Sequence, residues 1–326
     1  MKKTAGHTTG TLFDSAITLI CVLFFIAFTL ACSYPAAAEC NDITPSASHS
    51  LHISTPHQEG SDNNGASTQT SGENRNENLF GPLIADIRWP HFSIAYQYYI
   101  DDDELSSVVA TSFGETMPLL NGSSSLGGTW EVGIQAAVFA VFDIDSESKD
   151  LVNSDYWVGF PLSYRYRNFS AILRIFHQSS HIGDEYLLRS RIDRINLSYE
   201  SADLKLSYDV KDWFRVYGGG GYIFRREPED LKPWSTQFGF ELRSPRTYRI
   251  KNPVLPVIGA DIKSRQETSW KTDVSLRSGI QFHKKLINSR EYSLQIMLEY
   301  FNGYSPNGQF YERQIKYLGL GTHFYF

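Results

Sequence analysis

From Tyr156 to Tyr166 the chain alternates between two kinds of side chain. One set of positions is apolar: Tyr156, Val158, Phe160, Leu162, Tyr164 and Tyr166. The positions between them are mixed and include Trp157, Gly159, Ser163 and Arg165. Because successive side chains on a β-strand point to opposite faces, this segment has one apolar face and one mixed face. The run is as long as a membrane-crossing β-strand requires, about 9 to 11 residues.

The same alternation recurs along most of the chain. Clear examples follow at 169–175, 203–210, 237–242, 270–282 and 292–300. Further strands are expected near 91–99, 104–113, 128–142, 186–199, 213–225, 255–264 and 312–326, and tight turns are expected at 167–168, 200–202 and 265–268. Single-chain bacterial barrels have even strand numbers. We therefore predict 12 strands, with 14 as the alternative, and regard 104–113 and 186–199 as the weakest assignments.

These strands favour a transmembrane antiparallel β-barrel, an all-β fold, over a soluble β-sandwich. Sandwich strands average about five or six residues, whereas the runs here are longer and carry charged residues opposite the apolar face. The apolar faces often begin or end in Tyr, Trp or Phe, which suit the two membrane interfaces. A mean hydropathy of −0.30 fits the same reading, because a barrel alternates apolar and polar residues.

Two segments precede the barrel, which is expected to span residues 79–326. Residues 1–38 have the pattern of a secretory signal peptide: Lys2 and Lys3, an apolar stretch over 16–31, and small residues at 36–38. An uncleaved anchor helix and a lipid on Cys32 are the alternatives. Residues 39–78 are rich in Ser, Thr, Asn and Gly and are predicted to be a disordered linker. Cleavage would leave Cys40 alone, so no internal disulfide is expected.

The C-terminus and the charge balance limit the location and the partners. The chain ends "LGLGTHFYF", and the aromatic Phe326 resembles the C-terminal signature that the outer-membrane assembly machinery reads. We therefore expect the outer membrane of a Gram-negative cell, with membrane lipid or lipopolysaccharide and that machinery as partners. The chain has 30 Lys+Arg against 36 Asp+Glu, so nucleic acid is not expected.

Three stretches resemble an uncharacterised family of bacterial outer-membrane proteins, known only as a domain of unknown function. They are "LFGPLIADIRWPHFS" (79–93), "SSHIGDEY" (179–186) and "GYSPNGQFY" (303–311). The resemblance covers nearly all of the barrel and leaves the Ser/Asn-rich linker outside. It implies a location and no reaction.

The stretch "FHQSSHIGDEY" contains the candidate catalytic residues. His177, Ser179 and His181 continue the apolar face of the strand that starts at 169, while Gln178 and Ser180 face the interior. An imidazole beside a hydroxyl on one face can accept its proton and activate the oxygen as a nucleophile.

A third group must orient that imidazole. No Asn or Glu is evident on the same face of the neighbouring strand, so the candidate is Asp184, bending back from the turn. The segments expected as strands number thirteen in all, and counting back through them from a periplasmic C-terminus puts this turn on the periplasmic side.

This His-x-Ser pair resembles the one in outer-membrane phospholipase A and in the lipid A deacylases, which attack acyl esters from the outer wall of a barrel. The resemblance implies His177 as the base and Ser179 as the nucleophile, with calcium as a possible cofactor. An Asn follows the Ser in those enzymes, whereas Ser180 stands here. The structural alternative is that Ser179, His181, Gly183 and Asp184 shape a hairpin turn at headgroup level.

The remaining motifs do not predict a cofactor or a metal site. "DIDSESKD" (143–150) lacks the glycine and the final Glu of a calcium loop, "DDDE" (101–104) reads as a loop, and "GGGGY" (218–222) lacks the Lys of a phosphate loop. Inward charges of both signs are expected to pair and fill the interior: Arg165, Arg174, Lys205, Asp209, Asp273, Arg277 and Glu299.

Filling of this kind argues against a wide channel. We therefore expect a non-enzymatic barrel with a structural, surface-exposed or narrow-pore role. The alternative is a lipid-directed acyl hydrolase that uses His177 and Ser179.

Overall fold

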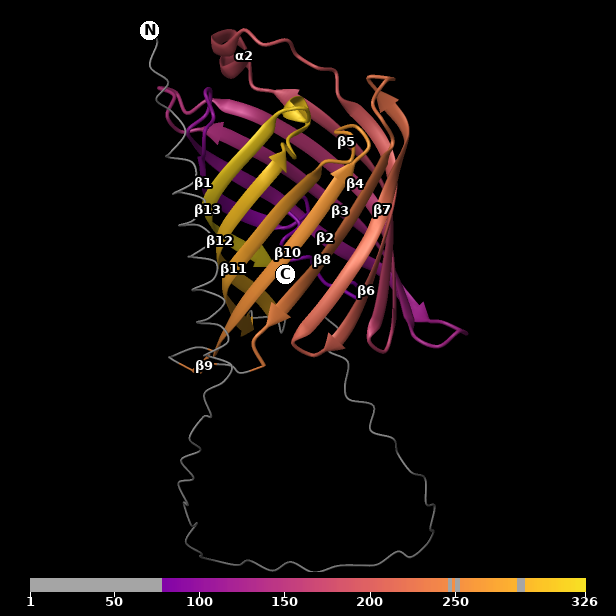
Figure 1. The fold of residues 1–326 in the computed structure, drawn as a ribbon. Coiled ribbons are helices and arrows are strands. Elements are labelled where there is room, and N and C mark those ends of the chain that lie inside the picture. The colour runs from indigo at the N-terminus through magenta and orange to yellow at the C-terminus, as the bar shows by residue number, and fades with distance from the viewer. Residues whose placement is uncertain (1–77, 246–247, 250–252, 286–290) are drawn as a thin grey trace, which may run out of the picture.

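The computed structural model describes residues 78–245, 248–249, 253–285 and 291–326. The predicted signal peptide and, apart from residue 78, the predicted linker lie outside these residues. The described chain forms a closed antiparallel β-barrel of twelve strands (Figure 1). The strands are β1 (Phe92–Tyr99), β2 (Ser107–Ser123), β3 (Thr129–Asp143), β4 (Leu151–Tyr166), β5 (Phe169–Ile182), β6 (Ser198–Lys211), β7 (Phe214–Glu227), β8 (Trp234–Arg243), β10 (Pro253–Arg265), β11 (Thr272–Lys285), β12 (Glu291–Tyr304) and β13 (Gln314–Tyr325).

Neighbouring strands pair in chain order, and β1 closes the barrel by pairing with β13. A short strand, β9 (Tyr248–Arg249), pairs with the start of β10. The prediction of 12 strands is therefore confirmed. The weak assignment at 104–113 corresponds to β2, which is longer than expected, and the turn at 167–168 is also confirmed.

Two local predictions are wrong. The segment 186–199 is not a strand: helix α2 (Asp184–Ser190) and an irregular stretch lie between β5 and β6. Asp184 and Glu185 in the first turn and Arg189 in the last match the helix dipole, and Arg191 ends the helix in a left-handed conformation. The expected turn at 200–202 lies inside β6. No helix in the described part of the chain is both long and apolar enough to cross a membrane.

The two faces of the strands separate as the alternation predicts. On β5, Ser170, Ile172 and Arg174 are buried inside the barrel, while Leu173 and Ile175 are exposed on the outer wall. Eleven of the twelve barrel strands have exposed apolar side chains of this kind, and the outward Val274, Leu276 and Ile280 of β11 are half-buried. Together they form an apolar band around the barrel. A wall of this kind is stable against lipid and costly against water.

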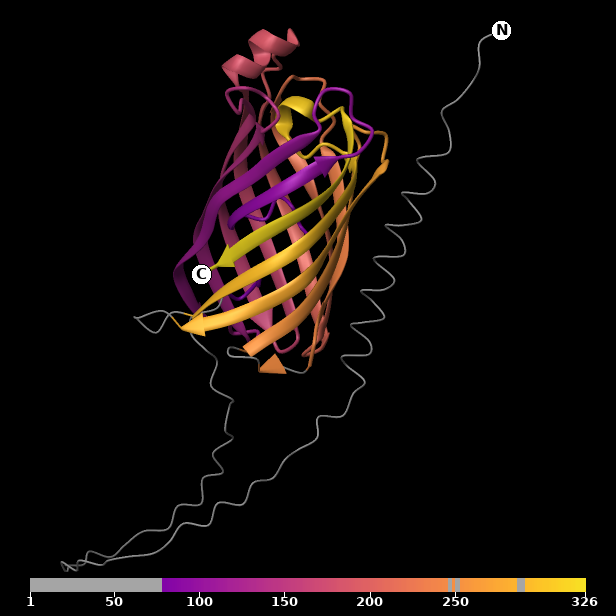
Figure 2. The ribbon, with the colours of Figure 1, turned by 90° about the vertical axis from the view of Figure 1, so that its left-hand side faces the viewer.

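The connections differ between the two ends of the barrel. One end, here the long-loop rim, is formed by 100–106, 144–150, 183–197, 228–233, 266–271 and 305–313. The other end, the short-turn rim, has tight turns at 167–168 and 212–213. Figure 2 shows α2 and the short 3-10 helix η1 (Gly308–Phe310) together at the long-loop rim.

The strand count changes the side of the candidate turn. Because 186–199 is not a strand, β5 ends at the rim opposite to the one where β13 ends. The predicted periplasmic position of the turn after β5 is therefore wrong if the C-terminus is periplasmic.

Residues 79–91 lie inside the barrel and are called the plug. Arg165 near the short-turn rim donates to the carbonyl of Leu79 at 3.3 Å, and the plug rises from there to a turn at 86–88. Phe80, Leu83 and Trp89 pack with Ile172 and Tyr217 of the barrel wall. This apolar contact fills the lumen where an open channel would hold water.

Ion pairs and hydrogen bonds hold the turn of the plug. Asp86 pairs with Lys263 and accepts a hydrogen bond from Gln237 at 3.1 Å. Arg88 forms an ion pair with Asp155 at 2.9 Å. Asp155 is fully buried, so this pair is enclosed by protein.

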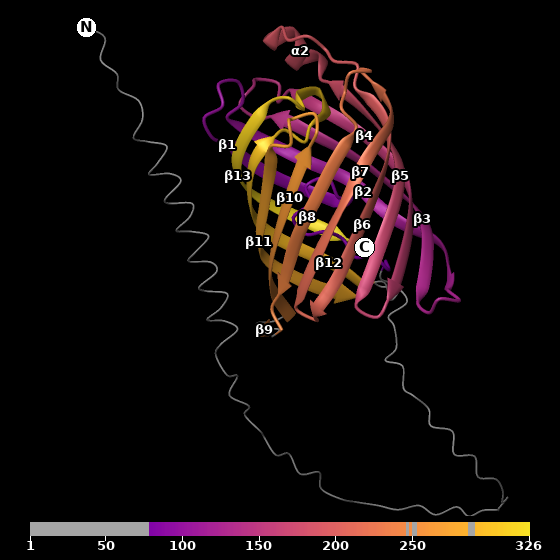
Figure 3. The ribbon, with the colours of Figure 1, turned by 45° about the vertical axis from the view of Figure 1, so that its right-hand side comes forward.

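The connection between β12 and β13 folds inward over the long-loop rim and is called the cap (residues 305–313). The backbone N–H groups of Gly308 and Gln309 donate to the side chains of Asp155 and Asn153, at 3.1 Å in each case. Figure 3 shows η1 at the mouth of the barrel beside the ends of the strands. Asp155 thus joins the plug to the cap.

The inward charges are paired, as predicted. The ion pairs are Arg165–Asp209 at 2.8 Å, Lys205–Asp203 at 2.7 Å, Arg265–Asp273 at 3.2 Å and Arg277–Glu299 at 3.0 Å, together with Arg174–Asp203. Two cavities remain beside the plug. One of about 190 Å³ lies between the plug and the cap, lined by polar groups and by Trp157, Phe176 and Tyr199, and one of about 340 Å³ lies towards the short-turn rim, lined by Trp89, Arg165 and Tyr325 among others. The described interior is therefore occupied by the plug and by paired charges, with these two cavities beside the plug.

Candidate functional site

The end of β5 places His177, Ser179 and His181 on the outer wall. His177 lies opposite Val158 of β4 and Glu200 of β6, and Ser179 lies opposite Tyr156 and Ser198. Gln178 and Ser180 are buried on the inner face. The prediction of which β5 side chains face outward and which face inward is confirmed. The histidines and Ser179 therefore share a face with the apolar band.

The imidazole of His177 has a carboxylate partner. Its Nδ1 lies 3.0 Å from Oε1 of Glu200, with the two side chains 40% and 30% exposed. Within the described part of the chain, the other ring nitrogen, Nε2, makes no hydrogen bond. A neutral imidazole that donates Nδ1–H to a carboxylate presents the lone pair of Nε2 as a base.

The expectation that no same-face Glu is available is therefore wrong. The incorrect strand at 186–199 placed Glu200 in an expected turn at 200–202, whereas the structure places it in β6. With β6 starting at Ser198, Glu200 has the same parity as Leu204 and Leu206, which are exposed on the outer wall.

Asp184 does not have the role expected for it. It is the first residue of α2 and is exposed, and Glu200 is the carboxylate bonded to His177. His181 has a different environment: the ring of Tyr156 meets it edge-on at 5.6 Å, and Arg194 lies 3.5 Å from its Nδ1.

The depth of the site follows from its neighbours on β4 and β5. Towards the short-turn rim, Ile175 is 52% exposed and Phe160 is 63% exposed, as parts of the apolar band. Towards the long-loop rim the wall ends within a few residues, at Ile182. Polar side chains are tolerated near an interface and costly at the midplane. His177, Ser179 and Glu200 lie at the upper edge of the band, where a membrane interface would be.

This arrangement has the components of nucleophilic acyl transfer. A serine hydroxyl can attack a carbonyl carbon, the imidazole can take its proton, and the carboxylate can hold the imidazole in one tautomer. Because the three side chains are on the outer wall, their substrate would arrive from the lipid side.

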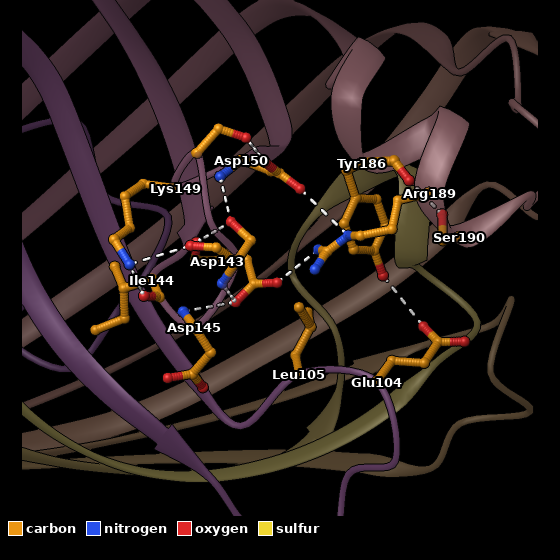
Figure 4. A network of polar contacts seen from close by, with 12 residues as sticks. Glu104, Leu105, Asp143, Ile144, Asp145, Lys149, Asp150, Tyr186, Arg189 and Ser190 are labelled. Atoms are coloured by element: carbon orange, nitrogen blue, oxygen red, sulfur yellow. Dashed lines mark hydrogen bonds and ion pairs between the residues drawn. The ribbon is translucent and has the colours of Figure 1, made fainter.

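The rim above the site is held by a network around α2 (Figure 4). Arg189 pairs with Asp143 at 2.6 Å and with Asp150 at 3.2 Å, and the hydrogen bond to Asp143 raises the pKa of this guanidinium. The Tyr186 hydroxyl donates to Glu104 at 3.1 Å. Burial raises the pKa of Tyr186 to about 12, and the charge of Glu104 acts in the same direction. These contacts fix α2 on the barrel.

The two acidic stretches are bound by cationic side chains of the protein. In "DIDSESKD", Arg189 contacts the side chains of Asp143 and Asp150, and the Lys149 ammonium donates to the carbonyls of Ile144 and Ser146. In "DDDE", Arg313 pairs with Asp102 and Glu104. In the described ranges, no group of three or more His, Cys, Asp or Glu residues is placed to hold a metal ion. Both stretches are rim loops, as their sequences indicated.

Comparison with known proteins identifies a family without a known activity. Residues 15–326 match the family described as "Protein of unknown function (DUF1207)". The match runs through the Ser/Asn-rich segment, which the resemblance in the sequence had left outside. No curated protein sequence matches the chain.

Several solved outer-membrane barrels have a similar fold. Outer membrane phospholipase A from Escherichia coli is 12% identical, with a TM-score of 0.49, over 72% of this chain and 90% of that one. The Salmonella typhi outer membrane phospholipase dimer with bound calcium is 10% identical, with a TM-score of 0.48, over 72% and 91%. The KdgM porin is 13% identical, with a TM-score of 0.37, over 72% and 99%. These likenesses concern the fold alone.

Proposed function

The chain belongs to the DUF1207 family of proteins of unknown function, and on that premise we propose that it is an integral protein of the bacterial outer membrane. The apolar band, the expected signal peptide and the aromatic C-terminal Phe326 support this location. Outer-membrane barrels have short periplasmic turns and longer external loops. The long-loop rim, with α2 and the cap, would then face the cell exterior.

The lumen does not support a role as an open channel. The plug occupies the lumen and is joined to the cap through the buried Asp155, and inward charges of the wall form ion pairs around it. Because the plug occupies the lumen, we look for the site that contacts another molecule on the outer wall, at His177, Ser179 and Glu200.

The reaction that the outer wall supports best is hydrolysis of an acyl ester of a membrane lipid. The Ser179 hydroxyl oxygen attacks the ester carbonyl carbon, and Nε2 of His177 takes its proton and passes it to the leaving alcohol. Water then attacks the acyl-serine, with His177 as base, and a free fatty acid leaves. The observation that carries this proposal is the Nδ1–Glu200 hydrogen bond of the histidine two residues from Ser179.

The reaction as written uses side chains of the protein. We propose no resident cofactor, and calcium is a variable of the assay.

The test is acyl release from phospholipid and from lipopolysaccharide by purified, refolded protein, with and without calcium. Ser179→Ala should lower the rate at least about 1,000-fold while the barrel stays folded, because the nucleophile is lost. The matched control is Thr322→Ala, which removes an outward hydroxyl from β13 far from β5. Equal rates in parent and Ser179→Ala protein would refute hydrolysis at this site.

The second candidate is a closed, surface-exposed barrel without catalytic activity. The extent of the interior ion-pair network favours it, because the fold is complete without any bound substrate. This candidate stands if the parent protein releases no acyl chain from any of these lipids.

A further inference from the structure

Two arginines flank the outer-wall site without a strong partner of their own. Arg225 of β7 lies opposite Glu200, with its Nε 3.8 Å from Oε2 of that carboxylate and its side chain 81% exposed. Arg194, in the stretch between α2 and β6, is exposed and reaches to 3.5 Å from Nδ1 of His181.

Two other arginines of the long-loop rim, Arg189 and Arg313, differ in this respect. Each of them contacts two carboxylates. Arg189 donates a hydrogen bond to Asp143, and Arg313 donates one to Glu104. Arg194 and Arg225 make no hydrogen bond to a carboxylate within the described ranges. Since a guanidinium carries several N–H donors in a planar fork, both keep donors available for an outside acceptor.

The positions of the two arginines suit a lipid headgroup. Arg225 lies across β6 from His177, and Arg194 lies at His181, one outward position from Ser179 towards the rim. Ser179 therefore has a guanidinium on two sides, at the upper edge of the apolar band. In a lipid leaflet the phosphate lies on the water side of the ester carbonyls, which is also where Arg194 lies relative to Ser179. Arg225 is level with His177 in the sheet register and approaches the same site from the side.

We infer that the outer-wall site takes a phosphate-bearing lipid with a net negative headgroup. Arg194 and Arg225 bind the phosphate oxygens through charge-assisted hydrogen bonds, and the acyl ester next to that phosphate is presented to Ser179. This inference rests on the proposed hydrolase function. The phosphate could belong to a glycerophospholipid or to lipid A, which share this chemistry.

The experiment compares two lipids in the same detergent, phosphatidylglycerol and phosphatidylcholine, with lipid A as a third arm. The parent should hydrolyse phosphatidylglycerol with a kcat/KM at least about 10-fold above that for phosphatidylcholine. Both lipids have the phosphate, but the choline cation of phosphatidylcholine balances its charge and repels the two guanidinium groups, whereas the headgroup of phosphatidylglycerol keeps a net negative charge. In Arg194→Gln/Arg225→Gln protein the preference should fall to about 2-fold or less, mainly through KM. Arg167→Gln, at the opposite rim, is the matched control and should keep the preference.

The third arm distinguishes the two sources of phosphate. Arginine-dependent acyl release from lipid A but not from phosphatidylglycerol would assign the phosphate to lipid A.

A second measurement separates the inference from the proposed function. Native mass spectrometry of Ser179→Ala protein counts bound phosphatidylglycerol and phosphatidylcholine without any turnover. Hydrolysis without headgroup preference, or a preference that survives loss of both arginines, overturns the inference and leaves the hydrolase intact. Selective, arginine-dependent binding in a protein that hydrolyses nothing overturns the hydrolase and leaves the anionic-lipid site. Neither hydrolysis nor selective binding overturns both.

Discussion

The interior of the barrel and its outer wall use polar side chains in opposite ways. Inside, Asp155 accepts bonds from the plug and the cap at once, and Asp203 pairs with two cations. On the outer wall, His177 has one bonded nitrogen and one without a hydrogen-bond partner in the described ranges. These interior carboxylates are paired with cations, whereas the outer imidazole keeps one nitrogen that can accept a proton.

The difference separates charges that stabilise the fold from a His–Glu pair whose proposed role is a reaction. A buried charge must have a partner or the fold is destabilised, so the interior pairs are explained by stability alone. A His–Glu pair on an apolar wall contributes little to stability, since both side chains are partly exposed. Its position at the upper edge of the band fits the proposed hydrolysis of a lipid ester.

The largest effect is expected when the plug is removed from the lumen. Deleting residues 80–90 should convert a non-conducting barrel into one with stepwise conductance in planar bilayers, because the deletion removes the apolar contacts that fill the lumen. Asp86→Asn/Arg88→Gln protein keeps the full chain and should show brief openings. Stepwise conductance in the parent itself would show that the lumen is not closed.

The second prediction concerns the outer wall. Glu200→Gln should lower acyl release by about 100- to 10,000-fold with little change in stability, because the amide no longer holds the imidazole in the reactive tautomer. Asp184→Asn is the matched control and should retain nearly full activity. A loss in Asp184→Asn with normal activity in Glu200→Gln would restore the partner expected from the sequence.

The third prediction concerns the interior pair. Asp155→Ala should lower the free energy of unfolding by about 3–5 kcal/mol, because Arg88 and the Gly308 N–H lose their acceptor. The measurement is urea unfolding of the protein in lipid vesicles, followed by tryptophan fluorescence. Asp155→Ala/Arg88→Ala protein should recover part of the loss, since it contains no unpaired charge. Acyl release per folded molecule should stay near the parent value.

The smallest effect is expected at the long-loop rim. Since the folded-state pKa of Tyr186 is raised from 10.0 to about 12, its contribution is complete below pH 10 and is lost as the pH rises through about 12. Hydrogen exchange of α2 should therefore accelerate over this range in the parent. Tyr186→Phe has no hydroxyl to ionise, and its exchange should change less across the same range. An equal response in both proteins would assign the effect to other groups.

Much of the barrel could be predicted from its sequence because alternation is a local property. The twelve strands, the outward phase of His177 and Ser179, and the pairing of Arg174, Lys205 and Glu299 all follow from parity. The structure adds the contacts that these positions make, such as the hydrogen bond between His177 and Glu200.

The errors arose where non-local contacts decide the structure. Glu200 faces His177 only because β6 starts at Ser198, and the charge-rich segment before it resembles a strand. Residues 79–91 have no periodicity, and their partners, such as Asp155 and Lys263, lie far along the chain. The apolar run of Phe80, Leu83, Ile84 and Trp89 before the first strand is the signal that could have indicated a plug.

The central claim, a reactive serine on the outer wall of a closed barrel, is tested most directly by covalent labelling. Folded protein in detergent is treated with a long-chain alkyl fluorophosphonate, and the modified peptide is identified by mass spectrometry. A reactive Ser179 predicts modification of that residue in the parent and at least about a 100-fold slower reaction in His177→Ala protein. An unmodified Ser179, or labelling at the same rate without His177, would contradict it.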